Sequence, residues 1–446
     1  MEQSLKQKIQ DIKKGKLKAV NNVLQFSEKI ATPKSKKQNI FLHLNPLALE
    51  QAKEIDKRIK NKKQVGKLAG LCYSVKSNIC VQGLTANCAS KVLENFTAPF
   101  DATVIKKLKA EDAICIGMVN MDEFACGASG ETSAFGPTLN PKNEKIIPGG
   151  TSSGSAASVA AELCDFSLGS ETGGSIRNPA SHCGVVGLKP SYGSVSRYGL
   201  IDMTMSFDQI GTLTHKAEDA KLIFDIIKGQ DNFDPTSLNA TKIKEKKTLT
   251  IGLVDVQDFC DKEISEIITK KTEELAKKHK FKIKKVNLPL DIAIQTYYLI
   301  VYTEFFSATR KFDGRRFGFK IEDKAGPEVL RRILGGEEIA QAEYAGKYYR
   351  NALKAQQYVK EQFNKLFKDC DILILPTVPR LAHNLGEKIS IKDMYNYDVT
   401  TALANIAGIC GISVPVGEID KKPLGLQIMA PRFHEDLLFQ VGKKVE

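Results

Sequence analysis

The sequence of 446 residues contains no tryptophan and only six histidines. The histidines show none of the spacings that zinc sites use, so we expect no metal site. His182 lies seven residues after Ser175, which raises the interpretation of a Ser–His pair. No acidic residue that would orient this histidine is identifiable, so the pair is the weaker interpretation.

Paired cysteines are also missing. The ten cysteines are scattered, and no Cys-x-x-Cys occurs, which argues against a redox motif or a zinc site. Several lie in apolar runs, where a free cysteine behaves as a small core residue. This usage is typical of a reducing cytosol.

Long apolar runs are absent as well. The longest uncharged apolar stretch, residues 292–303, is too short to cross a bilayer. The first six residues lack the apolar segment of a signal peptide, and Glu2 and Asp11 argue against an organelle transit peptide. We therefore expect a cytoplasmic protein with no membrane association.

The composition is that of a globular enzyme, with 42% hydrophobic and 26% charged residues. The net charge of +13 could favour nucleic acid or an acidic partner. Most of the positive charge is lysine spread along the chain, and runs such as 13–18 and 277–280 are first interpreted as solvated surface. No recognised nucleic-acid motif is present.

Two stretches rich in glycine and hydroxyl groups carry the strongest signal. They read PGGTSSGS at 148–155 and GSETGGSIR at 169–177, and Lys76 lies upstream in the largely uncharged run LCYSVKSN. A serine hydroxyl becomes a nucleophile when a base takes its proton, and a lysine serves as that base only if burial keeps it neutral. Glycines beside the serine leave backbone N–H groups bare for an oxyanion.

The alternative is that these stretches are flexible linkers, which Gly/Ser runs usually are. The first run, however, leads directly into the helix-forming AASVAA at 156–161, and FSL at 166–168 is typical of a short strand. A linker would not alternate with structure in this way. Pattern alone leaves catalysis and a structural role about equally supported.

Residues 149–190 resemble the signature of the amidase-signature family, whose catalytic set is Ser–cis-Ser–Lys. The blocks GGTSSGSAA, LGSETGGSIRNPA and CGVVGLKP carry the resemblance. It implies that Ser175 is the nucleophile, Lys76 the base and Thr151, 24 residues before Ser175, the bridging residue. Threonine replaces the usual serine at this position, and the resemblance implies a cis peptide bond at Gly150–Thr151.

Further strings resemble one branch of the family, the glutaminase (A) subunits of tRNA-dependent amidotransferases. They are NMDEFA at 120–125, SAFGPT at 133–138 and SRYGL at 196–200. This resemblance implies a B subunit that binds the mischarged tRNA and uses ATP and magnesium, and a small C subunit. No cofactor is then expected in this chain, and it has no G-x-x-x-x-G-K-[ST] phosphate loop.

The resemblance also implies a substrate pocket for glutamine. Arg332 would bind the α-carboxylate and Asp398 the α-ammonium, with Tyr297 helping to hold the substrate. Taken alone, these residues also suit a helix-surface pair, a helix N-cap and a core position. The oxyanion would be stabilised by the backbone around Thr172, Gly173 and Gly174 as far as Ser175.

The expected fold class is α/β, a single domain over residues 1–446 with a mixed central sheet wrapped by helices. An N-terminal helical segment covers 1–62, with Asn45 as an N-cap and Pro46 at the first turn, and the signature core covers 66–211. Apolar runs predict strands at 68–75, 113–119, 166–168, 246–256, 281–288 and 370–376, and a helix at 263–278.

Two other functions remain open at this point. The first is a stand-alone amidase of the same family acting on a small amide, which would have no need of Asp398 and Arg332. The second is a catalytically silent scaffold or tRNA-binding subunit, which Thr151 and the basic charge would suit. The sequence does not separate glutamyl- from aspartyl-tRNA specificity.

Overall fold

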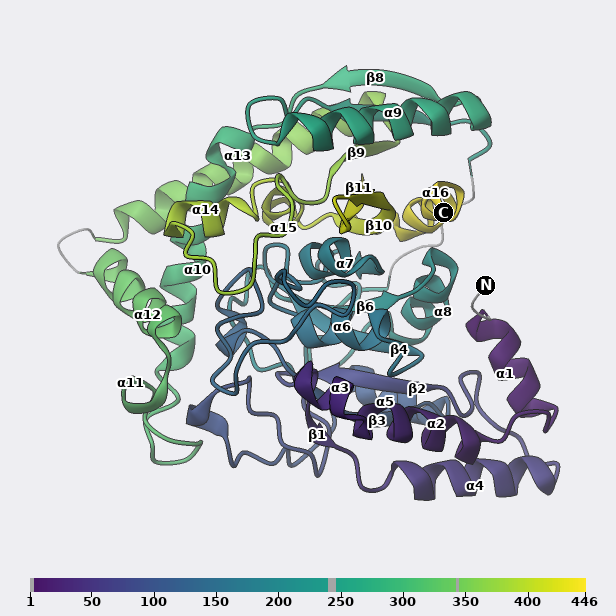
Figure 1. Cartoon of the computed structure of the whole chain (residues 1–446). Coiled ribbons are helices and arrows are strands. Elements are labelled where there is room, and N and C mark those ends of the chain that lie inside the picture. Colours follow the sequence, from purple (N-terminus) through teal and green to yellow (C-terminus); the bar gives the residue numbers. More distant parts are fainter. Residues whose placement is uncertain (1–3, 240–245, 342–344) are drawn as a thin grey trace.

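A computed structural model describes residues 4–239, 246–341 and 345–446. Its centre is one eleven-stranded mixed sheet, in the order β1-β3-β2-β4-β6-β5-β10-β11-β9-β7-β8 (Figure 1). The strands are β1 (Phe41–Leu44), β2 (Cys72–Lys76), β3 (Ile114–Val119), β4 (Phe166–Glu171), β5 (Val186–Lys189), β6 (Gln209–Thr214), β7 (Thr250–Val254), β8 (Lys282–Val286), β9 (Ile372–Pro376), β10 (Cys410–Ile419) and β11 (Lys422–Ala430).

Helices pack around this sheet (Figure 1). They are α1 (Leu5–Lys13), α2 (Ala19–Ala31), α3 (Pro33–Lys37), α4 (Ala48–Lys60), α5 (Thr103–Ala110), α6 (Ser153–Ala160), α7 (Arg177–Cys183), α8 (Ala217–Ile227), α9 (Lys262–His279), α10 (Ala293–Thr309), α11 (Ile321–Lys324), α12 (Pro327–Ala340), α13 (Lys347–Asp369), α14 (Ile391–Asn396), α15 (Ala402–Ala407) and α16 (Glu435–Val445). Short 3₁₀ turns cover Lys91–Leu93, Glu123–Ala125 and Leu290–Ile292.

The sheet joins strands from both ends of the chain. Strand β2 is parallel to β3 and β4, β7 is parallel to β8 and β9, and the strands between these groups are antiparallel. Strand β5 pairs with β10, so the signature core is bonded directly to the C-terminal hairpin. This continuity confirms the α/β class with a mixed sheet and supports the single domain, whose bounds stay a prediction.

The predicted strands near the signature are confirmed, with shifted ends. The strand predicted at 113–119 covers Ile114–Val119, and the one at 166–168 extends to Glu171. The strand predicted at 68–75 begins only at Cys72, because residues 67–70 form a turn. Gly70 has φ +75° there, a conformation that glycine adopts without strain.

The predicted β-α-β unit near the middle of the chain is present. Strands β7 and β8 are parallel and joined by α9, as the apolar spacing of 263–278 indicated. The first strand is shorter than predicted, starting at Thr250 rather than at 246. Strand β8 forms one edge of the sheet, and its first four residues are exposed, among them three lysines.

The predicted N-terminal helical segment contains α1, α2, α3 and α4 together with strand β1, which was not predicted, and its bounds stay a prediction. Helix α4 begins at Ala48, two residues later than the predicted cap implied. Asn45 still accepts a hydrogen bond at Oδ1 from the N–H of Leu47 at 3.0 Å, so it closes the turn that precedes the helix.

All ten cysteines are free and nine are buried, as their apolar surroundings predicted. Within the described ranges, no helix combines the length and apolarity that crossing a membrane would require. The same residues contain no cluster of three or more His, Cys, Asp or Glu side chains arranged to hold a metal ion.

Candidate active site

Three segments of the signature core meet at the carboxyl ends of two neighbouring parallel strands. Lys76 is the last residue of β2, and the loop 172–175 follows β4 directly. Thr151 lies just before helix α6, which packs on both strands. The sheet therefore brings together residues up to 99 positions apart, as parallel strands joined by crossovers do.

Lys76 is completely buried, and its ammonium is surrounded mostly by neutral oxygens. Its Nζ donates to Thr151 Oγ1 at 2.7 Å and to the Ser170 carbonyl at 3.0 Å. Burial lowers the pKa of Lys76 to about 7, although the charges of Asp122, Asp208 and Glu171 oppose this shift. A large fraction of Lys76 is therefore neutral near pH 7, as a general base must be.

Thr151 follows a cis peptide bond from Gly150, as predicted. Gly150 itself is fixed by close contact, since a Cβ there would lie 2.0 Å from Asp122 Oδ2. The next residue, Ser152, donates its N–H to the Ser175 carbonyl at 3.0 Å, which brings this segment against the nucleophile loop.

Hydrogen bonds connect only part of the proposed proton path from Ser175 through Thr151 to Lys76. Lys76 contacts Thr151 directly, but no hydrogen bond joins the Thr151 and Ser175 side chains among the described residues. Ser175 is 8% exposed, whereas Thr151 is 1% exposed and Lys76 is fully buried. The nucleophile therefore lies at the accessible end of the three, and the step between Thr151 and Ser175 stays a prediction.

The loop 172–175 offers its backbone to a ligand. Its four N–H groups donate no hydrogen bond within the part of the chain that the structure describes. Glu171 Oε2, by contrast, accepts the next two N–H groups, those of Ile176 at 3.0 Å and Arg177 at 3.1 Å. The free donors are therefore confined to the predicted oxyanion segment.

A buried ion pair anchors this loop to helix α15 and the residue before it. The Arg177 guanidinium bonds Glu171 and also donates to Asn405 Oδ1 at 2.6 Å and to the Thr401 carbonyl at 3.0 Å. The pairing with Arg177 holds the pKa of Glu171 below its ordinary value although the carboxylate is buried. Both charges are fully buried, so each depends on the other.

Two of the predicted substrate residues lie directly against the glycines of this loop. A Cβ at Gly173 would lie 2.6 Å from the Tyr297 hydroxyl, and one at Gly174 would lie 2.8 Å from Asp398 Oδ1. Any side chain at either position would collide with them. The structure thus brings Tyr297 and Asp398 to within a few ångströms of the nucleophile loop.

Asp398 is buried, and its side chain does not cap a helix. Its Oδ2 accepts a hydrogen bond from the Tyr298 hydroxyl at 3.0 Å, and burial raises its pKa to about 7. Helix α15 begins at Ala402, and the N–H of Ala402 bonds the backbone carbonyl of Asp398 rather than its carboxylate. The N-cap interpretation of Asp398 is therefore wrong.

Arg332 is buried as well, which overturns the alternative of a helix-surface pair. Its Nε donates to Glu328 Oε1 at 2.8 Å, one helical turn earlier on α12. Its guanidinium lies 5.4 Å from the ring of Tyr298 and 5.7 Å from that of Tyr395. Among the described residues its two Nη groups make no hydrogen bond, so they are available to a carboxylate.

A cavity of about 470 Å³ lies beside Glu328, the partner of this arginine. Glu328 and Arg331 contribute to its wall together with residues of the 123–134 segment and Met394. Arg331 bonds the same glutamate that holds Arg332 and donates to the Tyr395 hydroxyl at 3.1 Å. Tyr297, Arg332 and Asp398 do not themselves line this cavity, so it is not assigned to the substrate.

Sequence reasoning missed some residues of this site. Glu328 and Tyr298 hold two of the predicted binding residues, and Asp122 and Asp208 carry charges near Lys76. Only Glu328 had a local signal, its i,i+4 spacing to Arg332. His182 makes no hydrogen bond with Ser175, and burial lowers its pKa to about 3, which does not suit a base.

Comparison with known proteins places the chain in a family. A model of the family described as Amidase matches residues 21–439. The A subunit of the glutamyl-tRNA(Gln) amidotransferase of Methanocaldococcus jannaschii is 51% identical over 431 residues, covering 94% of this chain and 96% of that protein. Its counterpart in Methanothermobacter thermautotrophicus is 48% identical, covering 98% of each.

Solved structures agree. The crystal structure of the glutamyl-tRNA(Gln) amidotransferase A subunit from Thermotoga maritima has a TM-score of 0.80 at 34% identity, covering 96% of this chain and 91% of that one. A peptide amidase from Stenotrophomonas maltophilia has a TM-score of 0.83 at 25% identity, covering 100% and 96%. With its matching fold, its buried lysine and its Gly-Gly-Ser loop, the chain belongs to the amidase signature family.

Proposed function

We propose that this chain is the glutaminase subunit of a glutamyl-tRNA(Gln) amidotransferase. The observation that supports the proposal is the position of Asp398 against the loop that carries Ser175, in a chain whose buried Lys76 bonds Thr151. We propose Asp398 and Arg332 as the residues that bind an α-amino acid. The high identity to amidotransferase A subunits over nearly the whole chain supports the same assignment.

The proposed reaction begins at the side-chain amide of glutamine. Ser175 Oγ attacks the amide carbon while its proton passes through Thr151 to Lys76. The carbonyl π electrons move to the oxygen, which the N–H groups of residues 172–175 stabilise. The amide nitrogen then leaves with a proton as ammonia, and water hydrolyses the glutamyl–Ser175 ester to glutamate.

The substrate is held at its α-carbon end. The free Nη groups of Arg332 bind the α-carboxylate, and Asp398 binds the α-ammonium, with Tyr297 beside them. Asp398 and Tyr297 contact the loop that carries Ser175, so the same side chains that select an amino acid also fix its distance from the nucleophile.

The ammonia is proposed to serve a B subunit, with a small C subunit completing the complex in the cytoplasm. The B subunit binds the mischarged tRNA and uses ATP and magnesium to activate its carboxylate. The sequence of this chain contains no G-x-x-x-x-G-K-[ST] motif. Aspartyl-tRNA(Asn) is a second acceptor that such a complex can serve, and the acceptor is chosen by the partners.

The decisive experiment measures ammonia released from glutamine by the chain alone and after co-expression with the B and C subunits of its source. We expect release from glutamine and transfer to glutamyl-tRNA(Gln) by the complex. Hydrolysis of simple amides without activity on glutamine would favour a stand-alone amidase. Absence of any amide hydrolysis would favour a scaffold.

A further inference from the structure

A side-chain hydrogen bond follows the last residue pair of two neighbouring strands, at the point where the oxyanion loop begins. Strands β4 and β6 are antiparallel, and Glu171 and Gln209 form their last pair. Beyond that pair, Thr172 Oγ1 donates a hydrogen bond to Asp208 Oδ1 at 2.7 Å. Thr172 is the first residue of the oxyanion loop, so Asp208 holds this loop at its origin.

Asp208 is buried, and its other oxygen is also occupied. Oδ2 accepts the N–H groups of Met203 at 2.8 Å and Thr204 at 3.0 Å. Burial raises the pKa of Asp208 to about 6, so above that pH the carboxylate acts as an acceptor in all three bonds. It therefore clamps the turn 203–208 against the start of the oxyanion loop.

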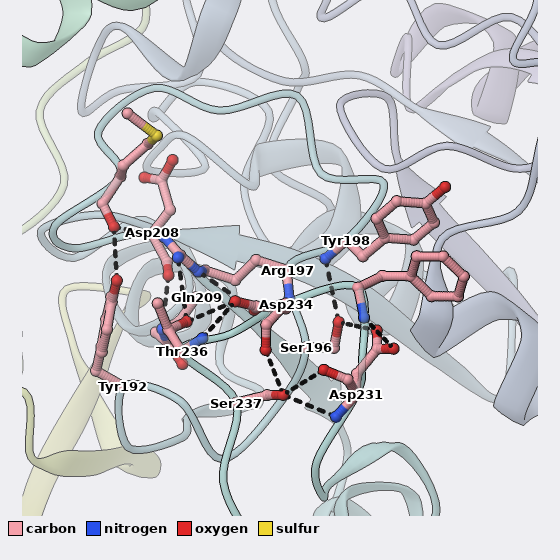
Figure 2. A network of polar contacts seen from close by, with 12 residues as sticks. Tyr192, Ser196, Arg197, Tyr198, Asp208, Gln209, Asp231, Asp234, Thr236 and Ser237 are labelled. Atoms are coloured by element: carbon pink, nitrogen blue, oxygen red, sulfur yellow. Dashed lines mark hydrogen bonds and ion pairs between the residues drawn. The ribbon is translucent and has the colours of Figure 1, made fainter.

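The outer side of this turn is held by a separate polar network (Figure 2). The Met205 carbonyl accepts hydrogen bonds from the Tyr192 hydroxyl, at 2.9 Å, and from the Arg197 guanidinium. Arg197 in turn donates its N–H to Asp234 Oδ2 at 2.8 Å and its Nη2 to Thr236 Oγ1 at 3.1 Å. These bonds fix the turn 203–208 on its exposed side. Asp208, at the end of the turn, then holds Thr172 at the start of the oxyanion loop.

We propose that Asp208 is a positioning residue for the oxyanion site, acting through the Thr172 hydroxyl on the backbone of residues 172–174. This inference rests on the proposed mechanism, in which those N–H groups stabilise the tetrahedral intermediate. In this proposal Asp208 does not touch the substrate. It affects the direction of the backbone N–H groups of the oxyanion loop.

The physical reason lies in the glycines. Gly173 and Gly174 have no side chain to restrict their backbone, and glycine has the widest conformational freedom of any residue. Two carbonyls near the end of the loop accept backbone N–H groups, that of Gly174 from Asn178 at 2.7 Å and that of Ser175 from Ser152 at 3.0 Å. The Thr172–Asp208 bond holds the start of the loop. Oxyanion donors act by being fixed before the reaction, and a small misplacement costs rate.

The test uses the assembled complex with four single variants and one double variant. Thr172→Val removes the hydroxyl and keeps the shape, Thr172→Ser keeps the hydroxyl, and Asp208→Asn exchanges one acceptor for a donor. Thr212→Val is the matched control, because Thr212 is a buried threonine on β6 whose hydroxyl has no hydrogen-bond partner within the described chain. We expect kcat for glutamine to fall about 10- to 100-fold in Thr172→Val.

The remaining variants test whether the hydroxyl is responsible. KM should change less than about twofold in Thr172→Val, Thr172→Ser should keep most of the rate, and Thr212→Val should match the wild type. Asp208→Asn is expected to weaken the fold as well. Its loss of kcat is therefore compared with that of the double variant Thr172→Val/Asp208→Asn. The two losses should overlap rather than multiply, since they remove the same bond.

A binding experiment separates positioning from general damage. The probe is a boronic acid analogue of glutamine in which B(OH)₂ replaces the side-chain amide. Ser175 Oγ adds to boron, its proton passes to Lys76, and one boron-bound oxygen occupies the oxyanion position. Thr172→Val should weaken this probe by about the same factor as kcat while leaving glutamate affinity unchanged.

Three results overturn the proposal: a kcat in Thr172→Val within about twofold of the wild type, equal damage in Thr172→Ser, or parallel losses of boronate and glutamate affinity. Failure of the proposed function is a different outcome. It shows as absence of ammonia release from glutamine by the wild-type complex, in which case the same variants are compared on butanamide.

Discussion

The residues proposed for catalysis and those proposed for substrate recognition are built into the molecule differently. The catalytic residues come from β2, the loop after β4 and the segment before α6, against an apolar cluster that includes Val75 and Phe166. The recognition residues come from α10, α12 and the segment before α15. Of these residues, Tyr297 belongs to a separate apolar cluster that includes Val329 and Ile333.

The way each set is held also differs. Backbone groups and short hydroxyl contacts fix the catalytic residues, as in the bond from Lys76 to the Ser170 carbonyl. Long side chains fix the recognition residues, with Tyr298 and Tyr395 stacked at 4.0 Å beside Arg332. The proposed catalytic residues are therefore positioned by the sheet, whereas the proposed recognition residues are positioned by the helices around it. We expect mutations in the two sets to change catalysis and substrate selectivity separately.

Removal of the nucleophile tests the catalytic side most severely. Ser175→Ala should lower the hydrolysis of every amide by about 10⁴-fold or more, because a covalent mechanism loses its attacking atom. The fold should remain, since the site is already lined by small residues. Ammonia release from glutamine and from butanamide measures the effect, and retention of more than about a tenth of the wild-type rate on either would contradict the assignment.

Replacement of the base should be nearly as damaging. Lys76→Ala loses the proton acceptor, and Lys76→Arg should not restore it, since arginine stays protonated in proteins. Free ammonia supplied to the assembled complex should restore product formation, because the defect lies only in generating ammonia. If ammonia does not rescue the complex, the role of Lys76 is structural.

The bridging residue should show an intermediate effect. Thr151→Val keeps the shape but removes the hydroxyl, so activity on both substrates should fall about 100-fold or more. Thr151→Ser should remain active. Tolerance of valine together with loss of activity in Ser152→Ala would place the relay at Ser152, whose Oγ donates to the Ser170 carbonyl at 3.0 Å.

The recognition side should separate the two substrates. Asp398→Asn and Arg332→Lys should lower kcat/KM for glutamine about 10- to 100-fold, because the first loses the ion pair and the second the planar fork of donors. Butanamide, which lacks both α groups, should lose less than about threefold. Arg310→Lys, on an exposed arginine, is the control. Equal losses on both substrates would show that Asp398 and Arg332 do not act in recognition of the α groups.

The smallest expected effect is a difference in pH dependence. The pKa of Lys76 is lowered to about 7 and that of Asp398 raised to about 7, both by burial. Lys76 must be deprotonated to accept a proton and Asp398 deprotonated to bind an ammonium, so both functions are lost as pH falls below 7. Here Lys76 faces Asp122, Asp208 and Glu171, and Asp398 faces Arg332, Glu171 and Arg177.

In acid, kcat/KM should therefore fall by about 100-fold per pH unit for glutamine and about 10-fold for butanamide, which needs only Lys76. Asp398→Asn should reduce the glutamine slope to that of butanamide. Identical slopes for both substrates in the wild type would show that Asp398 does not contribute.

The sequence predicted the fold class and the sheet strands around the signature, and it proposed site residues that the structure brings close together, although their roles stay a prediction. It did so because the catalytic residues lie in short motifs whose chemistry depends on residue type. Strand ends were less well predicted, as at residues 68–70, where apolar residues lie buried in a turn. Apolar periodicity reports burial, and burial does not distinguish a turn from a strand.

The supporting residues could not be found from sequence. Asp208 reaches Thr172 only because β4 and β6 pair in one register, and Tyr298 reaches Asp398 across 100 positions. Neither contact leaves a local pattern. The adjacent tyrosines Tyr297 and Tyr298 illustrate the limit, since one contacts the Gly173 backbone and the other bonds Asp398, and only the packing of α10 decides which does which.

The lysines of β8 have a consequence for the chain's solubility. An open sheet edge presents unpaired backbone groups, which another chain can use to extend the sheet into an aggregate. Three of the five residues of this strand are lysines, and all three are exposed. Lys284 is paired with Asp369 at 2.6 Å, so a second copy approaching edge to edge would bring chiefly the charges of Lys282 and Lys285 of both copies together. Part of the chain's positive charge is therefore explained by protection of this edge, without any nucleic acid.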